Sequence, residues 1–211
     1  LLELMSNESK ICKYIDLPLQ HINDRILRLM HRNTTKKDIL KLIDKIRTRI
    51  PDVAIRTSII VGFPSETDKE FKELLNFIED IRFERLGAFI YSQEEGTKAH
   101  NFKPQVPGKI KIGRFNTLMS YQQRISQDIN KEFLGKTIDV LIDEKDLALS
   151  TAQRHPQTRK NGIYLGRSQY DAPEVDGLIY VNSQRALKPG DFVKVKVTDT
   201  LEYDLVGEAL A

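Results

Sequence analysis

Three short segments carry residue types suited to ligand binding, and each follows a predicted strand. They read Pro-Leu-Gln-His at 18–21, Val-Gly-Phe-Pro-Ser-Glu-Thr at 61–67 and Tyr-Ser-Gln-Glu-Glu-Gly-Thr at 91–97. In parallel α/β folds, ligands bind at the carboxyl ends of the strands. Gly62 lets backbone approach a ligand closely, and the helix that begins after Glu66 could meet a carboxylate or a phosphate. Singly, each segment is an ordinary strand-to-helix turn, but three at equivalent positions favour a binding edge.

Several individual side chains, in these segments and elsewhere, have more than one interpretation. His21 is a candidate base or ligand, and the alternative is a hydrogen-bonded structural histidine. Arg56 lies in a strand otherwise suited to burial, where a guanidinium needs an anionic partner. That partner is either a structural salt bridge or the carboxylate of a ligand. Asp16 and Glu66 are a candidate carboxylate pair that the sequence alone cannot bring together. The remaining histidines are interpreted as surface residues: His31, His100 and His155.

Neither metal nor thiol chemistry is indicated within this chain. Its single cysteine, Cys12, is interpreted as a small buried hydrophobic residue in a strand. One cysteine forms no internal disulfide and holds no iron–sulfur cluster by itself. No pair of His, Cys or carboxylate residues has metal-ligand spacing, and no Ser-His-Asp arrangement is readable. We therefore predict no metal site here, a reducing or indifferent compartment, and a cytoplasmic location.

The elements that must position these residues alternate between strand and helix over the first hundred positions. Hydrophobic spacing, capping residues and β-branched runs define them. Their order predicts right-handed βαβ units and a parallel sheet, and three strands are too few to close. The sheet is then either small and open or half of a barrel. The predicted elements are strand 12–17, helix 23–32, a helix capped by Thr34 or Thr35 that ends at Pro51, strand 53–61, a helix opened by the Thr67–Glu70 capping box, and strand 86–91.

A different pattern follows the linker at 103–108. A long helix is predicted at 109–133 and ends at Gly135. Five short apolar runs then alternate with Gly, Pro and Asn-Gly turns, which predicts an OB-like antiparallel β-barrel. The polar segment 145–161 is predicted to be a loop. The fold class is therefore α/β plus all-β, with domains at 1–134 and 135–211.

Charge separates the two domains. The 211-residue chain carries a net charge of +3, but residues 135–211 hold ten Lys/Arg against twelve Asp/Glu. Sequence-independent nucleic-acid binders usually present a basic face, so nucleic acid is a less favoured partner. No apolar run approaches the roughly 20 residues that a membrane span needs, so no membrane association is predicted. The chain begins with Leu-Leu rather than Met and has no signal peptide, so we expect an excerpt of a longer protein.

Several strings resemble one enzyme family. IDLPLQHINDRILRLMHR, RTSIIVGFPSETDKEF and YSQEEGTKA resemble the second half of the barrel in radical-SAM methylthiotransferases. GRSQYDAPEVDGLIYV and LKPGDFVKVKVTDTLEYDLVGE resemble their C-terminal TRAM domain. The Pro-Leu-Gln-His and Asp-Ala-Pro-Glu-Val-Asp-Gly strings are similar to the branch that modifies an aspartate in a small-subunit ribosomal protein. The branch that modifies tRNA typically has a Gln-Ser-Gly version of the first motif and lacks the acidic version of the second.

The resemblance implies a cofactor and a reaction. Members carry two 4Fe–4S clusters, one on a CxxxCxxC loop that cleaves S-adenosylmethionine to a 5′-deoxyadenosyl radical. The radical removes hydrogen from the β-carbon of an aspartate, and a methylthio group replaces it. This chain has no CxxxCxxC. By this mapping it holds strands four to six of a six-stranded barrel, and we expect the excerpt alone to bind no cofactor and to be inactive.

The resemblance also assigns residues. Contacts to adenosylmethionine are expected from Gln20, His21, Arg56, Ser58, Gly62, Phe63 and Tyr91, although Ser58 stands where the family often has glycine. Because ribosomal proteins are basic, substrate contacts are expected from Asp171, Glu174 and Asp176, unless these form a solvated acidic turn.

Two other functions stay open. The first is a tRNA methylthiotransferase, which needs a basic TRAM surface. The second is a non-enzymatic RNA- or protein-binding module in which the barrel only scaffolds the TRAM domain. A half-barrel also exposes a strand edge and an apolar inner face, so self-association of the fragment is predicted.

Overall fold

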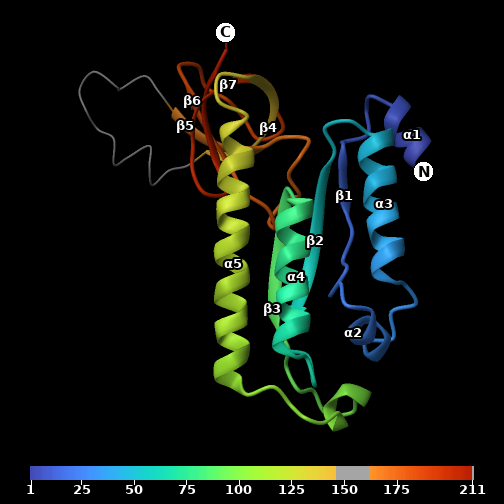
Figure 1. Cartoon of the computed structure of the whole chain (residues 1–211). Helices are drawn as coiled ribbons and strands as arrows, with labels where there is room; N and C mark the ends of the chain where they lie inside the picture. Colours follow the sequence, from blue (N-terminus) through green and yellow to red (C-terminus); the bar gives the residue numbers. More distant parts are fainter. Residues whose placement is uncertain (146–161, 211) are drawn as a thin grey trace. The chain divides into compact units, whose positions relative to one another are not determined.

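The computed structural model describes residues 1–145 and 162–210 and forms two compact units, Leu1–Ile125 and Ser126–Ala211. The division falls inside the long helix α5 (Gly108–Lys131), which contributes residues to both units (Figure 1). The domain boundary expected after residue 134 lies beyond the end of this helix and stays a prediction.

The N-terminal unit is built on an open parallel sheet of three strands in the order β1-β2-β3. One face of β2 is buried at Ile55, Thr57, Ile59 and Val61. Helices α3 and α4 each bury apolar side chains in this unit, and Figure 1 shows both helices running alongside the strands. The opposite face of β2, with Arg56, Ser58 and Ile60, is only half-buried. The elements are α1 (Leu2–Asn7), β1 (Tyr14–Asp16), α2 (Asp24–Leu29), α3 (Lys36–Arg49), β2 (Ala54–Val61), α4 (Asp68–Ile81), β3 (Arg85–Ile90) and the 3₁₀ turn η1 (Lys98–Asn101).

Local sequence explains most of these boundaries. Thr35 caps α3 together with Asp38, and Thr67 caps α4 together with Glu70, each in a reciprocal capping box. The box formed by Thr67 and Glu70 was predicted from the sequence and is confirmed. Cys12 lies outside β1 and is exposed, so the interpretation of a buried strand cysteine is wrong. The strand begins only at Tyr14, where pairing with Ala54 starts.

Helix α2 is shorter than predicted because the backbone closes it early. His31 adopts a left-handed φ of 55°, and its N–H donates to the carbonyl of Arg28 at 3.0 Å. The N–H of Arg32 donates to the carbonyl of Leu27 at 2.9 Å. This pair of bonds is the Schellman motif, in which glycine usually takes the left-handed position.

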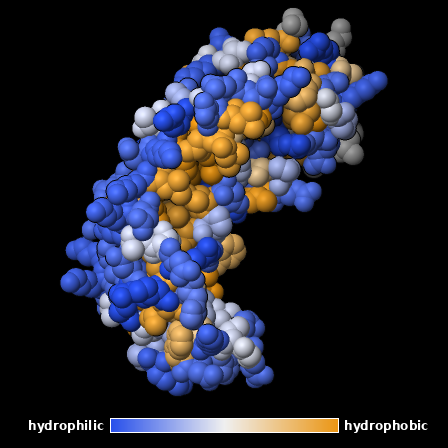
Figure 2. All heavy atoms as spheres, turned by 90° about the vertical axis from the view of Figure 1, so that its right-hand side faces the viewer, coloured by the Kyte–Doolittle hydropathy of each residue, from blue (hydrophilic) through white to orange (hydrophobic). Residues whose placement is uncertain are grey.

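The sheet leaves β1 and β3 each with a strand neighbour on one side only among the described residues. Phe89 of β3 is 55% exposed. Figure 2 views the side on which α1 and α3 lie in Figure 1, and it shows a band of hydrophobic surface between hydrophilic residues. Free strand edges and exposed apolar surface favour association between copies. Self-association stays a prediction, which sedimentation at increasing protein concentration would check, and a monomer at all concentrations would contradict it.

The C-terminal unit is a closed five-stranded barrel in the order β4-β5-β6-β8-β7. The barrel confirms the predicted OB-like architecture, but β6 and β8 pair in parallel, whereas every pair was expected to be antiparallel. Residues 146–161, which hold most of the predicted polar loop, lie outside the described residues. The strands are β4 (Thr137–Lys145), β5 (Gly162–Arg167), β6 (Ile179–Ser183), β7 (Phe192–Thr200) and β8 (Leu205–Ala209), and their core holds Val140, Ile142, Tyr164, Ile179, Val181, Leu187, Val193, Val195, Val197 and Leu205.

Candidate functional site

The three segments singled out in the sequence meet at the carboxyl edge of the sheet. The N–H of Gln20 donates to the carbonyl of Ser58 at 2.8 Å, and the N–H of Ile60 donates to that of Gln20 at 2.8 Å. The N–H of Tyr91 donates to the carbonyl of Val61 at 3.0 Å. Backbone pairing therefore continues past β1 and β3 and fixes all three segments against the end of β2.

A pocket with a volume of about 440 Å³ opens at this edge. Gln20, Ile60, Phe63 and Tyr91 line it, and the rings of Phe63 and Tyr91 meet edge to face with centroids 5.2 Å apart. This volume lies within the range of small-molecule sites, roughly 300–1,000 Å³. Three of the seven residues predicted to contact adenosylmethionine thus border one pocket.

Arg56 and Ser58 lie earlier in β2 than the pocket residues, on the half-buried face of the strand. The register pairs Arg56 with Asp16 on one side and Ser58 with Gly87 on the other. The guanidinium of Arg56 donates to the carboxylate of Asp16 at 2.8 Å. This contact supports the salt-bridge alternative for Arg56.

His21 is fully buried, and its polar contacts are internal. Its Nδ1 accepts a hydrogen bond from the N–H of Asn23 at 2.9 Å, and its Nε2 lies 3.9 Å from Oε2 of Glu66. Burial lowers the pKa of the imidazole to about 4. The ring is therefore neutral near pH 7, with its remaining proton on Nε2 facing Glu66. These contacts favour the structural alternative, and a contact to the cofactor stays a prediction.

Glu66 organises the turn that follows β2. Its Oε2 accepts hydrogen bonds from the N–H groups of Gly62 at 2.8 Å and Phe63 at 3.2 Å. Its Oε1 accepts one from Arg114 at 2.9 Å. Burial raises the pKa of Glu66, although the charge of Arg114 acts in the opposite direction. The N–H groups of Gly62 and Phe63, which an external anion would need as donors, are thus already bound to Glu66. Asp16 and Glu66 do not form the candidate carboxylate pair, because each binds a different arginine.

Arg114 is a site residue that the sequence reasoning missed. It is buried on α5, and its second terminal nitrogen donates to Asp68 at 2.7 Å. A signal was present, because Arg114 lies four residues before Leu118 and so interrupts the apolar stripe of the predicted helix. A charged residue in such a stripe indicates a buried partner.

Lys111, one turn before Arg114, holds the other strand end. Its Nζ donates to the carbonyl of Tyr91 at 2.9 Å and lies 4.8 Å from the centroid of the Tyr91 ring. Its aliphatic stem packs on Gly62, where φ is 72° and an added Cβ would lie 2.5 Å from Lys111 Cγ. Burial lowers the pKa of this lysine. The first turns of α5 therefore clamp both segments that border the pocket.

The buried imidazole predicts a pH dependence of stability. Because the pKa of His21 falls from 6.5 to about 4 on folding, the unfolded chain binds this proton first as the pH drops. The contribution of His21 to the free energy of unfolding is present above pH 6.5 and is lost as the pH falls from 6.5 to 4. The loss is roughly 3 kcal/mol, at about 1.4 kcal/mol per pH unit. Urea unfolding at a series of pH values measures this slope. His21→Gln should flatten it, whereas the exposed control His31→Asn should not, and equal slopes in all three proteins would contradict the assignment.

The three acidic residues predicted to contact substrate have different surroundings. Asp171 accepts hydrogen bonds from the N–H of Ser168 at 3.1 Å and from its hydroxyl at 2.6 Å. Asp176 accepts one from the N–H of Ala172 at 2.8 Å. Glu174 is exposed and has a left-handed φ of 62°. Two carboxylates therefore shape their own loop, and a substrate contact stays a prediction.

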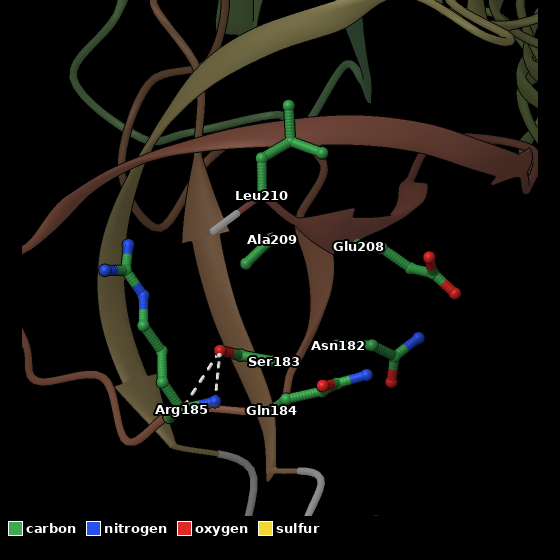
Figure 3. A pocket seen from close by; sticks show the side chains of 7 residues that line it. All are labelled: Asn182, Ser183, Gln184, Arg185, Glu208, Ala209 and Leu210. Atoms are coloured by element: carbon green, nitrogen blue, oxygen red, sulfur yellow. Dashed lines mark hydrogen bonds between the residues drawn. The ribbon is translucent and has the colours of Figure 1, made fainter.

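A second hollow of about 470 Å³ lies on the C-terminal unit, and none of the predicted residues lines it. Figure 3 shows Arg185 on one side and Asn182 and Glu208 on the other, from the ends of β6 and β8. The hydroxyl of Ser183 donates to the carbonyl of Arg185 at 2.9 Å and accepts from its N–H at 3.3 Å, so it is used within the turn. The hollow is lined by both apolar and polar side chains, and both charge signs are present, from Arg185 and Glu208.

Two features are absent from the described residues. Within residues 1–145 and 162–210, no three His, Cys, Asp or Glu side chains are placed to hold a metal ion. In that same part of the chain, no helix has the length and apolar character needed to cross a membrane.

Comparisons with known proteins match both halves of the chain. The radical SAM superfamily model matches residues 1–78, and the TRAM domain model matches residues 134–210. A solved structure of coproporphyrinogen III oxidase from Escherichia coli, a radical SAM enzyme, covers 54% of this chain and 27% of its own, at 19% identity and a TM-score of 0.46.

Curated relatives match over the whole chain. "Ribosomal protein uS12 methylthiotransferase RimO" of Desulforamulus reducens is 48% identical over 99% of this chain. The proteins of that name from Clostridioides difficile and Caldanaerobacter subterraneus are 44% identical over 100% and 47% identical over 99% of this chain. The chain spans 44% of the length of each of these relatives.

Proposed function

The chain belongs to the radical-SAM methylthiotransferase family and matches the C-terminal part of its members, and we propose that the whole protein methylthiolates an aspartate of ribosomal protein uS12. The observation that carries the proposal is the sequence identity of 44–48% to proteins named uS12 methylthiotransferases, over 99–100% of the chain. The convergence of three segments on one pocket supplies a place where such chemistry would be organised.

The residues at the strand ends fit S-adenosylmethionine. We propose that the aromatic rings of Phe63 and Tyr91 contact its apolar parts and that the amide of Gln20 binds a polar group. Arg56, Ser58 and the backbone of Gly62 extend the site along β2, and His21 supports the turn from within. When bound beside an iron–sulfur cluster, this cofactor supplies the radical that removes the substrate hydrogen. The single cysteine of this chain is no ligand set for a cluster, so the two 4Fe–4S clusters are assigned to the rest of the protein.

The substrate assignment is supported by charge. Residues 135–211 carry two more acidic than basic residues, which favours a basic protein over RNA. We propose that the acidic loop with exposed Glu174 contributes to docking of uS12.

A binding comparison tests this assignment against the tRNA alternative. The affinity of the protein for purified uS12 and for tRNA is measured at several salt concentrations. Tighter binding of uS12 supports the proposal, and tight, salt-sensitive tRNA binding would favour the tRNA-modifying branch. Glu174→Lys should weaken uS12 binding, whereas Glu95→Lys, an exposed charge reversal in the other unit, should not. The scaffold alternative is favoured if the gene encodes no CxxxCxxC upstream.

A further inference from the structure

The pocket at the strand ends has a second set of lining residues that the cofactor proposal does not use. His31 and Arg32 border it from the end of α2, and Lys98 borders it from η1. All three are exposed, and none forms an ion pair with a residue in the described part of the chain. No Asp or Glu is among the described residues that line the pocket. The pocket therefore combines an apolar floor with a rim of basic side chains.

The backbone at this rim is strained. His31 occupies the left-handed position of the Schellman motif that ends α2, with φ at 55°. A residue with a Cβ is disfavoured at this backbone conformation, and glycine would remove that strain. The left-handed conformation of His31 places the consecutive residues His31 and Arg32 at the pocket border. Glycine would close the helix equally well without the strain.

We propose that this basic rim binds the carboxylate of an acidic side chain of the protein substrate, while Ile60 and Met30 contact its apolar neighbours. A guanidinium pairs with a carboxylate in a planar, two-bond geometry, and an ammonium adds a charge-assisted hydrogen bond. The inference rests on the proposed function, because it identifies the bound group with the aspartate that is modified. Nucleic acid is less well suited, since phosphate tracking needs an extended basic surface rather than one small pocket with an apolar floor.

The test is a titration of the whole protein with each of two peptides, acetyl-Asp-Leu-amide and acetyl-Asn-Leu-amide. Binding is followed by NMR, which detects weak binding. The aspartyl peptide should bind about tenfold more tightly than the asparaginyl peptide at low salt. Arg32→Gln should abolish most of this preference. His31→Gly should raise the unfolding midpoint and reduce the preference. The matched control Asp52→Gly, at another exposed left-handed position with φ of 60°, should raise the midpoint and leave the preference unchanged.

Each contrary outcome overturns the inference. Equal affinity for the two peptides, or an unchanged preference in Arg32→Gln, shows that the basic rim does not bind the carboxylate. Displacement of the aspartyl peptide by S-adenosylmethionine assigns the carboxylate to the cofactor instead of the substrate. Failure of the proposed function is seen separately, as an absence of uS12 methylthiolation by the wild-type protein, because the peptide titration involves no turnover.

Discussion

Replacement of Arg114 by methionine is expected to lower the free energy of unfolding of the N-terminal unit by about 3–5 kcal/mol. The guanidinium donates to the side chain and carbonyl of Glu66 and to Asp68, and Arg114 is only 6% exposed. Methionine preserves much of the apolar volume but leaves the buried Glu66 carboxylate without its cation. Urea unfolding measures the loss, and Lys109→Met, an exposed site on the same helix, is the matched control.

A double-mutant cycle separates the lost pair from lost packing. Glu66→Met alone removes the hydrogen bonds to Gly62 and Phe63 as well as the ion pair. The double variant leaves neither charge buried, so its cost should be clearly smaller than the sum of the two single costs. Additive costs, or a cost of Arg114→Met no larger than that of the Lys109 control, would show that the pair does not hold this turn.

The second large effect is expected from Gly62→Ala. Gly62 has a φ of 72°, and the new Cβ would lie 2.5 Å from Cγ and 3.1 Å from Cβ of Lys111. The left-handed backbone costs about 1–2 kcal/mol for alanine, and overpacking adds about 1–3 kcal/mol. Because Lys111 also binds the Tyr91 carbonyl, its displacement should open the pocket and weaken adenosylmethionine binding by the whole protein.

Gly96→Ala is the control for this variant. Gly96 also has a positive φ, of 80°, but a Cβ added there would have no neighbouring atom within 4 Å. It should show the backbone cost alone, about 1–2 kcal/mol, and leave cofactor affinity unchanged. Thermal unfolding and a cofactor titration check both variants. Equal behaviour of the two would mean that the packing of Lys111 on the turn is unimportant.

Local signals in the sequence predicted much of the fold. The Thr67–Glu70 capping box and the five punctuated apolar runs depend on neighbouring residues, and both are confirmed. The end of α2 was misplaced because His31 adopts a conformation that favours glycine, and nothing in the residue type signals it. Cys12 was misjudged because its apolar neighbours suggested a strand that begins only at Tyr14.

The sequence predicted which segments meet at the candidate site, but it did not predict which side chains pair there. Strand-end placement brought Gln20, Phe63 and Tyr91 to one pocket, as the parallel topology requires. The pairing of Glu66 with Arg114 joins positions 48 residues apart, and the sequence offers no way to match those two charges. The basic rim likewise combines the end of α2 with η1, a 3₁₀ turn that was not predicted.

The most direct test of the central claim is mass spectrometry of uS12 after incubation with the full-length protein that contains this chain, its iron–sulfur clusters reconstituted, S-adenosylmethionine and a reductant. One aspartate of uS12 is expected to gain a methylthio group in place of a hydrogen, and tRNA in a parallel reaction is expected to be unchanged. Unmodified uS12 together with a methylthiolated tRNA would contradict it.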